Sequence, residues 1–387
     1  MVDELSRRQM LRRGIVVAGV AALGIPEWAI PVLAEGEELV PFTDVPSDFT
    51  TNPKPGVRYL DTRKIESFLT PSDQFFTVQH YGQPVVDPAT YKLRVSGLVE
   101  RPIELSLGEL KKRPRVEHIA GFECSGNSPK RISGMAGNAR WAGASLASVL
   151  SDCGIRPQAK EVVFFGADKG TEEVSHGGGT ATVEQRFARS LALEDAVSPD
   201  VLLAYEMNGE PLSQYQGAPL RLIVPGWYGV ANIKWLEHIH LQDRRFMGKF
   251  MAREYVTLRG HKVNDEILWN ESSVSRIQLT SAVVRVTRKA GRFQILGFAL
   301  NDGTPLKSVE VRIDNADWQP ATIDPASTSH SWKLFTIPWE SPAKGEHTLA
   351  SRAIDINGTI QPTEEELVFK KTRWENNGQV VRRVLVS

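Results

Sequence analysis

The spacing of hydrophobic residues changes near residue 270, where mixed segments give way to short alternating runs. In the run Val309–Ile313, three aliphatic residues fall on one side of an extended strand and two charged residues on the other. Asn301-Asp302-Gly303 and Asn357-Gly358 are typical turn signals between such runs. About seven short strands in about 110 residues predict an immunoglobulin-like sandwich over residues 266–387. The other runs are Ser281–Val286, Phe293–Leu300, Trp332–Ile337 and His347–Ile356.

Residues 35–265 mix helix and strand patterns without regular alternation, which predicts an α+β domain behind an extended lead-in. A helix is expected over Ser145–Cys153, because apolar residues recur at helical spacing and Gly154 is a natural stop. Strands are expected where β-branched and aromatic residues precede turn residues. They are Glu161–Phe165, Val201–Met207 and Leu220–Val224.

The first 34 residues predict export. Ser6–Leu11 contains the paired arginines of a twin-arginine signal, which carries folded proteins to the periplasm. The apolar run Ile15–Ile25 is shorter than the roughly 20 residues needed to span a bilayer. Val32-Leu33-Ala34 is a loose match to a cleavage site, so an uncleaved membrane anchor stays open as an alternative.

Composition excludes some functions. The 46 basic and 46 acidic residues give a net charge of zero, so charge offers no reason to expect nucleic acid or an anionic membrane as a partner. Two cysteines, Cys124 and Cys153, cannot make a disulfide-rich scaffold. Cys153 ends the predicted helix and is interpreted as a core residue. Cys124 lies between small residues that leave room for a bulky group, and is either buried structure or a soft metal ligand.

Common catalytic motifs are missing from the sequence. It has no phosphate-binding glycine loop, no HExxH, no CxxC pair and no haem-attachment motif. The triplet Gly177-Gly178-Gly179 is more typical of a flexible loop than of a ligand site.

Several segments, in order and far apart, resemble the sulfite oxidase family of molybdenum enzymes. The resemblance covers nearly all of the chain after the signal. The segments are Phe75–His80, Phe122–Asn127, Asn138–Gly143, Val201–Leu212 and Gly217–Trp235. Several ordered matches are much harder to reach by chance than one motif.

The resemblance implies Mo-molybdopterin as cofactor and Cys124 as the metal ligand, which suits the sulfur preference of molybdenum. Arg221 and Lys234 would bind the pterin phosphate. Trp141 and Tyr255 would lie on the substrate side as catalytic residues. The resemblance also assigns cofactor-binding side chains to His80, Asp168, Gln216 and Asn232. Each of these residues taken alone also fits an ordinary structural role.

The chain departs from the family where sulfite would be bound. Val78 stands where the family has an arginine, and a second arginine position falls near Pro129, with Lys130 or Arg131 as substitutes. A third falls at Asn377, with Arg382 and Arg383 further on. The departures suit a less charged or bulkier substrate, or a pocket that draws its charge from other residues.

The sequence therefore predicts a periplasmic oxidoreductase in three parts: a signal peptide (1–34), a molybdopterin-binding domain (35–265) and a dimerisation domain (266–387). The expected reaction is oxidation of sulfite to sulfate, with electrons passed to an external c-type cytochrome. Alternatives are the same cofactor acting on sulfane or organic sulfur, an S-oxide or nitrate, and a cofactor-free periplasmic binding protein. A cysteine hydrolase is a weaker alternative, because no motif places a histidine beside Cys124. The expected partners are a small oxyanion or sulfur compound and a second copy of the chain, with no nucleic acid and no membrane after cleavage.

Overall fold

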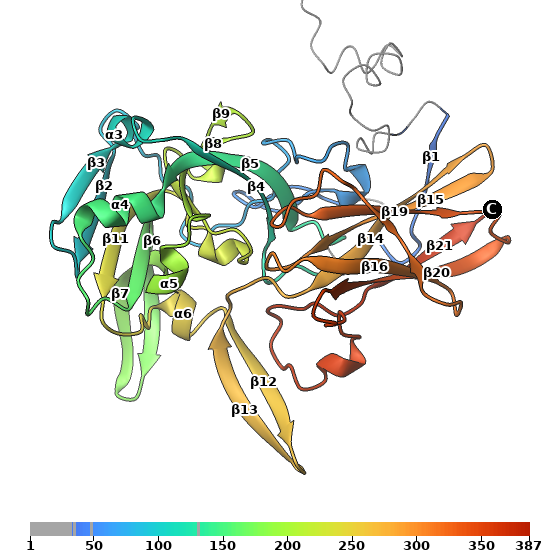
Figure 1. Ribbon diagram of the computed structural model, residues 1–387. Coiled ribbons are helices and arrows are strands. Elements are labelled where there is room, and N and C mark those ends of the chain that lie inside the picture. The colour runs from blue at the N-terminus through green and yellow to red at the C-terminus, as the bar shows by residue number, and fades with distance from the viewer. Residues whose placement is uncertain (1–32, 34–35, 47–48, 130–131) are drawn as a thin grey trace, which may run out of the picture.

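The computed structural model describes residues 33, 36–46, 49–129 and 132–387. The predicted signal peptide, apart from Leu33, lies outside the described residues, and so do Lys130 and Arg131. Strands dominate the structure, and the helices are few and short (Figure 1). In the described part of the chain, no helix has the length and apolar character needed to cross a membrane.

The first lobe contains two mixed or antiparallel five-stranded sheets. One has the strand order β3-β2-β11-β6-β7, in which β11 and β2 run parallel. The other has the order β10-β8-β5-β4, with β9 paired to β8. The strands of the first are β2 (Lys92–Gly97), β3 (Ile103–Ser106), β6 (Glu161–His176), β7 (Gly179–Ala192) and β11 (Leu236–Gln242). Those of the second are β4 (Val116–Glu123), β5 (Ala136–Ser145), β8 (Leu202–Met207), β9 (Glu210–Pro211) and β10 (Arg221–Ile223).

Short helices join these strands, and local sequence explains where they begin and end. The helix predicted over 145–153 is confirmed as α4 (Leu146–Cys153). Ser145 caps its first turn, and Gly154 ends it with a positive φ of 68°. In α3 (Leu107–Lys111), Ser106 and Glu109 form a reciprocal capping box. The remaining helices are α5 (Leu193–Ala196) and α6 (Lys249–Ala252), with 3₁₀ turns η2 (Thr62–Lys64), η4 (Gln214–Gln216), η5 (Gly229–Ala231) and η6 (Glu365–Leu367).

The second lobe is a pair of β-sheets with a core between them. One sheet has the order β1-β14-β15-β19-β18 and the other β17-β16-β20-β21. The strands predicted in this region are all present and most are longer than expected. They are β14 (Thr280–Lys289), β15 (Arg292–Leu300), β16 (Leu306–Ile313), β17 (Gln319–Pro320), β18 (Thr322–Ile323), β19 (Lys333–Trp339), β20 (Gly345–Asp355) and β21 (Val381–Val386). Val286, Ile295, Val309 and Leu349 are fully buried between the sheets, as the alternating pattern requires.

Two features cross the predicted domain boundaries. The lead-in supplies β1 (Glu38–Val40), which pairs with β14 and so belongs to the second lobe's sheet. The predicted boundary at 265/266 falls in the turn of a hairpin formed by β12 (Val256–Val263) and β13 (Glu266–Ser273). This hairpin projects from the body of the molecule between the two lobes (Figure 1).

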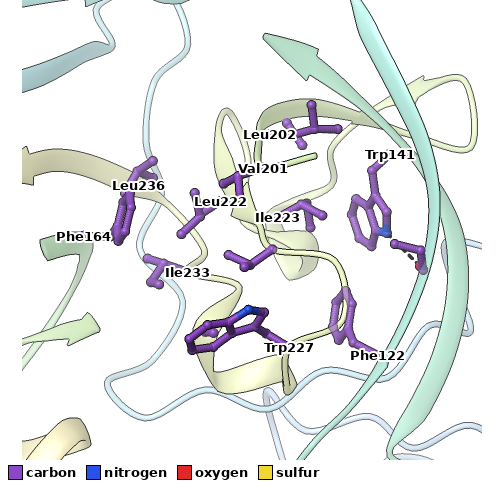
Figure 2. Packing of buried hydrophobic residues seen from close by; sticks show 14 of the residues in the cluster. Phe122, Trp141, Phe164, Val201, Leu202, Leu222, Ile223, Trp227, Ile233 and Leu236 are labelled. Carbon is purple, nitrogen blue, oxygen red and sulfur yellow. Dashed lines mark hydrogen bonds between the residues drawn. The ribbon is translucent and has the colours of Figure 1, made fainter. Parts of the chain in front are cut away.

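The core of the first lobe lies between its two sheets. Figure 2 shows Leu222, Ile223 and Ile233 packed between the phenylalanine and leucine side chains of the first sheet and the ring of Trp141. These residues are at most 1% exposed. The tight packing fixes the chain around β10, and β10 and the segment after it carry three of the seven candidate cofactor residues, Arg221, Asn232 and Lys234.

Candidate functional site

One cavity brings together eight of the nine predicted site residues. It contains about 600 Å³ of empty space, counting the part that opens to solvent. Its walls come from the segment before β2, β4 and the loop after it, β6, β7, the turns around β10 and the segment after α6. The predicted residues that line it are His80, Cys124, Asp168, Gln216, Arg221, Asn232, Lys234 and Tyr255.

Cys124 is half-buried at the end of β4, and main-chain hydrogen bonds hold its loop. Its N–H donates to the carbonyl of Met135 at 2.9 Å, and its own carbonyl accepts from the N–H of Asn127 at 2.8 Å. The side chain of Asn127 donates to Glu123 at 3.0 Å and accepts from the N–H of Met135 at 3.1 Å. The thiol is therefore presented to the cavity from a loop with few degrees of freedom. The structure contains no disulfide between Cys124 and Cys153.

Two cations face the cavity, and neither forms a salt bridge with a carboxylate of the described residues. The guanidinium of Arg221, 3% exposed, donates to the carbonyl of Asn232 and to the side-chain oxygen of Gln216 at 3.0 and 3.1 Å. The ammonium of Lys234 donates to the hydroxyl of Thr77 at 3.0 Å. Burial lowers the pKa of Arg221 to about 9 and, together with the nearby Arg221, that of Lys234 to about 7. A buried cation with neutral partners is costly, and an anionic ligand would remove that cost.

Four polar atoms of the cavity wall have no hydrogen-bond partner among the described residues. They are Oδ1 of Asp168, Nε2 of Gln216, Nε of Arg221 and Nε1 of Trp235. Buried polar groups are nearly always paired in folded proteins, so a cluster of unpaired ones indicates a missing partner. Burial also raises the pKa of Asp168 to about 6, with the Lys234 charge opposing the shift. The wall offers three donors, an acceptor and a cation to a polar ligand.

His80 and Tyr255 form a pair on another wall of the cavity. Nε2 of His80 lies 2.7 Å from the Tyr255 hydroxyl, and the imidazole stacks on Phe187 with ring centroids 4.8 Å apart. Burial, helped by Lys234 and Lys249, lowers the pKa of His80 to about 4. Burial raises the pKa of Tyr255 above its ordinary value. Both groups are therefore neutral near pH 7 and can exchange donor and acceptor roles.

The structure places two predicted residues in structural roles. Trp141 does not line the cavity: it is 0% exposed, and its indole N–H donates to the carbonyl of Ala120 at 3.2 Å (Figure 2). Its ring lies 4.9 Å from the Arg221 guanidinium, so its position supports packing beneath that cation rather than contact with a ligand. Asn232 does line the cavity. Its side chain bonds to the backbone of Val224 and Tyr228, which fixes the turn before Lys234.

Of the positions that depart from the family pattern, one lines the cavity. Val78 lines the cavity, so its isopropyl group stands where the resemblance implied a guanidinium. Asn377 is buried elsewhere and donates to the carbonyl of Leu279. Arg382 pairs with Asp44 at 3.1 Å, and Arg383 pairs with Glu346 at 3.7 Å. Neither arginine lines the cavity.

Sequence reasoning missed several cavity residues. Thr77 and Gln79 accept hydrogen bonds from Lys234, and Trp235 contributes its indole N–H with a backbone φ of 49°. These three lie inside segments that carry the family resemblance, so the signal was the segment itself. Phe187 lies on β7 outside those segments, and no local pattern marks it. The glycine triplet 177–179 is at the turn between β6 and β7 and does not line the cavity.

The residues present fit a pterin cofactor that carries a phosphate and a metal. Two unneutralised cations suit the phosphate, and the unpaired amide, indole and carboxyl atoms suit the polar edges of a ring system. A half-buried cysteine on the same cavity suits a soft metal such as molybdenum. A cavity with this set of groups on a mostly β scaffold defines a cofactor-binding oxidoreductase domain.

Comparisons with known proteins agree. Residues 80–250 match the family model for the oxidoreductase molybdopterin binding domain. The chain is 29% identical over 339 residues to the mitochondrial sulfite oxidase of Drosophila melanogaster, covering 79% of this chain and 57% of that protein. It is 29% identical over 343 residues to the sulfite oxidase of Arabidopsis thaliana, covering 79% of this chain and 85% of that protein. This chain belongs to the sulfite oxidase family of molybdopterin oxidoreductases, with Mo-molybdopterin as the family's cofactor.

A solved structure confirms the fold. The sulfane dehydrogenase SoxCD from Paracoccus pantotrophus superposes with a TM-score of 0.72 at 22% identity, covering 89% of this chain and 90% of that one. Both lobes fall within this similarity. The chain spans a little over half the length of the Drosophila relative.

Proposed function

We propose that this chain is a molybdenum oxidoreductase that performs two-electron oxygen-atom transfer on a sulfur compound, with sulfite as the first substrate to test. One observation carries the proposal. The half-buried Cys124 shares its cavity with two cations that lack a carboxylate partner and with four polar atoms that lack a hydrogen-bond partner in the described chain. Such a wall is costly to keep without a ligand, and a phosphate-bearing polar cofactor matches it group by group.

The residues divide into two groups. Arg221 and Lys234 would hold the cofactor's phosphate, Gln216 and Asp168 its ring edges, and the Cys124 thiolate its metal. When bound, Mo-molybdopterin supplies the oxygen-atom transfer and the two-electron redox change.

On the substrate side, Tyr255 orients a bound oxyanion, and His80, which the family resemblance assigns to the cofactor, also contacts Tyr255. A phenol that keeps its proton can donate a hydrogen bond to an anionic oxygen. His80 fixes the direction of that phenol through the 2.7 Å contact. Phe187 and Phe250 pack against the imidazole, with ring centroids 4.8 and 4.6 Å away, and exclude water from it. The weak basicity of His80 keeps a positive charge from forming there near pH 7.

Val78 supports a second candidate substrate class. An isopropyl group on the cavity wall offers nothing to a dianion and favours a less charged sulfur compound, such as sulfane or organic sulfur or an S-oxide. Nitrate is the remaining alternative with this cofactor. A cysteine hydrolase gains no support, because His80, the histidine among the described lining residues, directs Nε2 to Tyr255.

Location and partners complete the proposal. The twin-arginine pattern of Ser6–Leu11 supports folded export to the periplasm. A c-type cytochrome would accept the electrons, since the sequence has no haem-attachment motif. The second lobe would be an immunoglobulin-like dimerisation domain, a role that its two packed sheets can serve.

Molybdenum content per chain is the first experiment. Wild type, Cys124→Ser and Cys153→Ser are purified from a host that makes the cofactor, and metal is counted by elemental mass spectrometry. We expect near-stoichiometric molybdenum in wild type and Cys153→Ser, because the Cys153 thiol is 0% exposed and donates to the carbonyl of Val149. Cys124→Ser should lose the sulfur-to-metal absorption band.

Either result is decisive. Wild-type protein that is folded but free of molybdenum would leave the cofactor-free binding protein as the function. If the metal is present, a panel of sulfite, thiosulfate, dimethyl sulfoxide and nitrate separates the substrate candidates.

A further inference from the structure

Trp374 lies in a three-layer stack with Tyr255, which lines the cavity, and with Arg373. Its ring stacks on Tyr255 with centroids 4.3 Å apart and planes 26° from parallel. The guanidinium carbon of Arg373 lies 4.3 Å from the same ring centroid. Two groups cannot share one face at that distance, so Tyr255 and Arg373 cover opposite faces of the indole.

The same indole approaches the cysteine loop. A Cβ atom on Gly126 would lie 3.3 Å from Cζ3 of Trp374 and 3.9 Å from Sγ of Cys124. Glycine at 126 therefore leaves just enough room for the ring beside the thiol. Trp374 is partly buried and packs against the first lobe's core together with Cys124.

A second, open cavity, here called the outer cavity, shares two of the residues that contact Trp374, Gly126 and Arg373. Gly126, Lys370 and Arg373 line it, with Glu364 on its rim, while Tyr255 and Cys124 line the inner cavity. Trp374 touches Gly126 and Arg373 on the outer side and Tyr255 on the inner side. The indole thus contacts residues that line both cavities.

A buried carboxylate anchors the segment that carries this indole. Glu375, 4% exposed, accepts from the hydroxyl of Thr257 at 2.6 Å and from Arg259 at 3.4 Å, both on β12. Its backbone N–H donates to the carbonyl of Ser125 at 2.7 Å, beside Cys124. The second lobe's chain is therefore bonded to the cysteine loop directly next to Trp374. An indole held in this way is a fixed wall.

We propose that Trp374 is a specificity-determining residue that limits the size of the group reaching Cys124. A compact head such as a sulfite-sized oxyanion passes along the edge of the stack, and a substituent as wide as a phenyl ring is excluded. The proposal rests on the proposed function for the chemistry of the ligand. The steric argument itself needs only the positions of Trp374, Gly126 and Tyr255.

Two sulfonates that share the –SO₃⁻ group and differ in the size of the attached substituent test this size limit without turnover. Methanesulfonate and benzenesulfonate both carry a fully oxidised –SO₃⁻ group that cannot accept another oxygen atom. Their binding to molybdenum-loaded protein is measured by calorimetry for wild type, Trp374→Ala and Trp374→Phe. Trp269→Ala is the matched control, because Trp269 is 46% exposed on the β12–β13 hairpin and does not line the inner or the outer cavity.

We expect wild type and the control to bind methanesulfonate at least tenfold more tightly than benzenesulfonate. Trp374→Ala should tighten benzenesulfonate binding at least tenfold while changing methanesulfonate binding less than threefold, and Trp374→Phe should fall between. The proposal is overturned if the ratio of the methanesulfonate and benzenesulfonate affinities is the same in Trp374→Ala as in wild type, in a variant that melts within a few degrees of wild type.

The two proposals fail separately. If wild type holds molybdenum but binds neither sulfonate, an oxyanion substrate is excluded, and the neutral pair dimethyl sulfoxide and methyl phenyl sulfoxide replaces them with the same criterion. If Trp374→Ala does not fold, the test uses Trp374→Phe. This variant must then bind benzenesulfonate at least threefold more tightly than wild type. Loss of molybdenum from wild type itself counts against the proposed function alone.

Discussion

The hydroxyl of Tyr255 lies 2.7 Å from Nε2 of His80, inside the cavity that also holds Cys124. The two side chains are 175 positions apart in sequence. Burial favours the neutral form of both groups: it lowers the pKa of the imidazole to about 4 and raises the pKa of the phenol. The pair can therefore present a hydrogen bond to a ligand without introducing a charge.

Replacing Tyr255 by phenylalanine should lower kcat about 10- to 100-fold, because one hydrogen bond to a charged ligand is worth about 1.5–3 kcal/mol. Molybdenum content should stay near wild type, since the phenol is not among the groups assigned to the cofactor. Steady-state kinetics and elemental mass spectrometry on the same preparation give both values.

Tyr91→Phe is the control, because the Tyr91 hydroxyl donates to the carbonyl of Leu236 and does not line the cavity. It should lower the melting temperature and leave kcat within about twofold, which is a difference of less than about 0.5 kcal/mol in the barrier. Equal kcat losses in the two variants would contradict a ligand-directed role for Tyr255.

Lys234 makes the folding stability of the cofactor-free protein depend on pH. Its pKa falls from 10.5 to about 7 on folding, so between pH 7 and 10.5 the unfolded chain binds more protons and this contribution to stability rises with pH. Lys234→Met should therefore melt higher than wild type near pH 7 by about 2–4 °C, a gain limited by the lost hydrogen bonds to Thr77 and Val78. The advantage should shrink toward pH 10.

The measurement is a melting-temperature series at pH 7, 8.5 and 10 on cofactor-free wild type and Lys234→Met. The same substitution should reduce molybdenum retention when the cofactor is supplied, because the phosphate loses a cation. A variant that melts lower than wild type by the same amount at every pH would show that the ammonium is not desolvated in the folded protein.

Local sequence patterns predicted α4 and several strands, and the family resemblance pointed to eight of the residues that line the cavity. Ser145 caps the first turn of α4 and Gly154 ends it, so local sequence determines the bounds of this helix. Arg221 and Lys234 lie together in Gly217–Trp235, one of the segments that closely resemble the family. Trp141 shows the limit. Its segment carries the resemblance, but the side chain is directed into the core, where it bonds to Ala120 on the neighbouring strand.

The C-terminal segment could not be placed from sequence at all. Glu375 meets Thr257 across 118 positions, and nothing in the residues around either one predicts the contact. The segment that carries Trp374 and Glu375, here called the strap, reaches the cysteine loop only because the second lobe docks beside the first. Long-range contacts of this kind depend on how lobes pack, and periodicity and capping signals describe only neighbours.

For Glu123 we predict the opposite pH dependence of stability to that of Lys234. Burial raises its pKa from 4.5 to about 7, so between these values the folded chain binds more protons and this contribution to stability falls as pH rises. Glu123→Gln keeps an acceptor for Asn127 and removes the buried charge. The variant should be more stable than wild type by about 1–3 kcal/mol at pH 8, with no difference near pH 4.

Urea unfolding at pH 4 and pH 8 measures both values. Glu161→Gln is the matched control: Glu161 is equally buried but pairs with Arg245 at 3.2 Å, so removing its charge should destabilise the protein at pH 8. A gain of the same size in both variants would mean that burial of Glu123 is not the cause.

The last prediction concerns Glu375, whose side chain anchors the strap to β12. Glu375→Gln retains an oxygen for Thr257 but loses the charge that faces Arg259, so the free energy of unfolding should fall by about 1–2 kcal/mol. Because the Glu375 backbone is bonded to Ser125 beside Cys124, the looser strap should also raise KM for the substrate more than it lowers kcat. Glu364→Gln, an exposed carboxylate on the rim of the outer cavity, should leave stability and KM close to wild type. Urea unfolding and steady-state kinetics on the two variants test the prediction, and a Glu375→Gln enzyme with wild-type stability and KM would show that the carboxylate does not hold the strap.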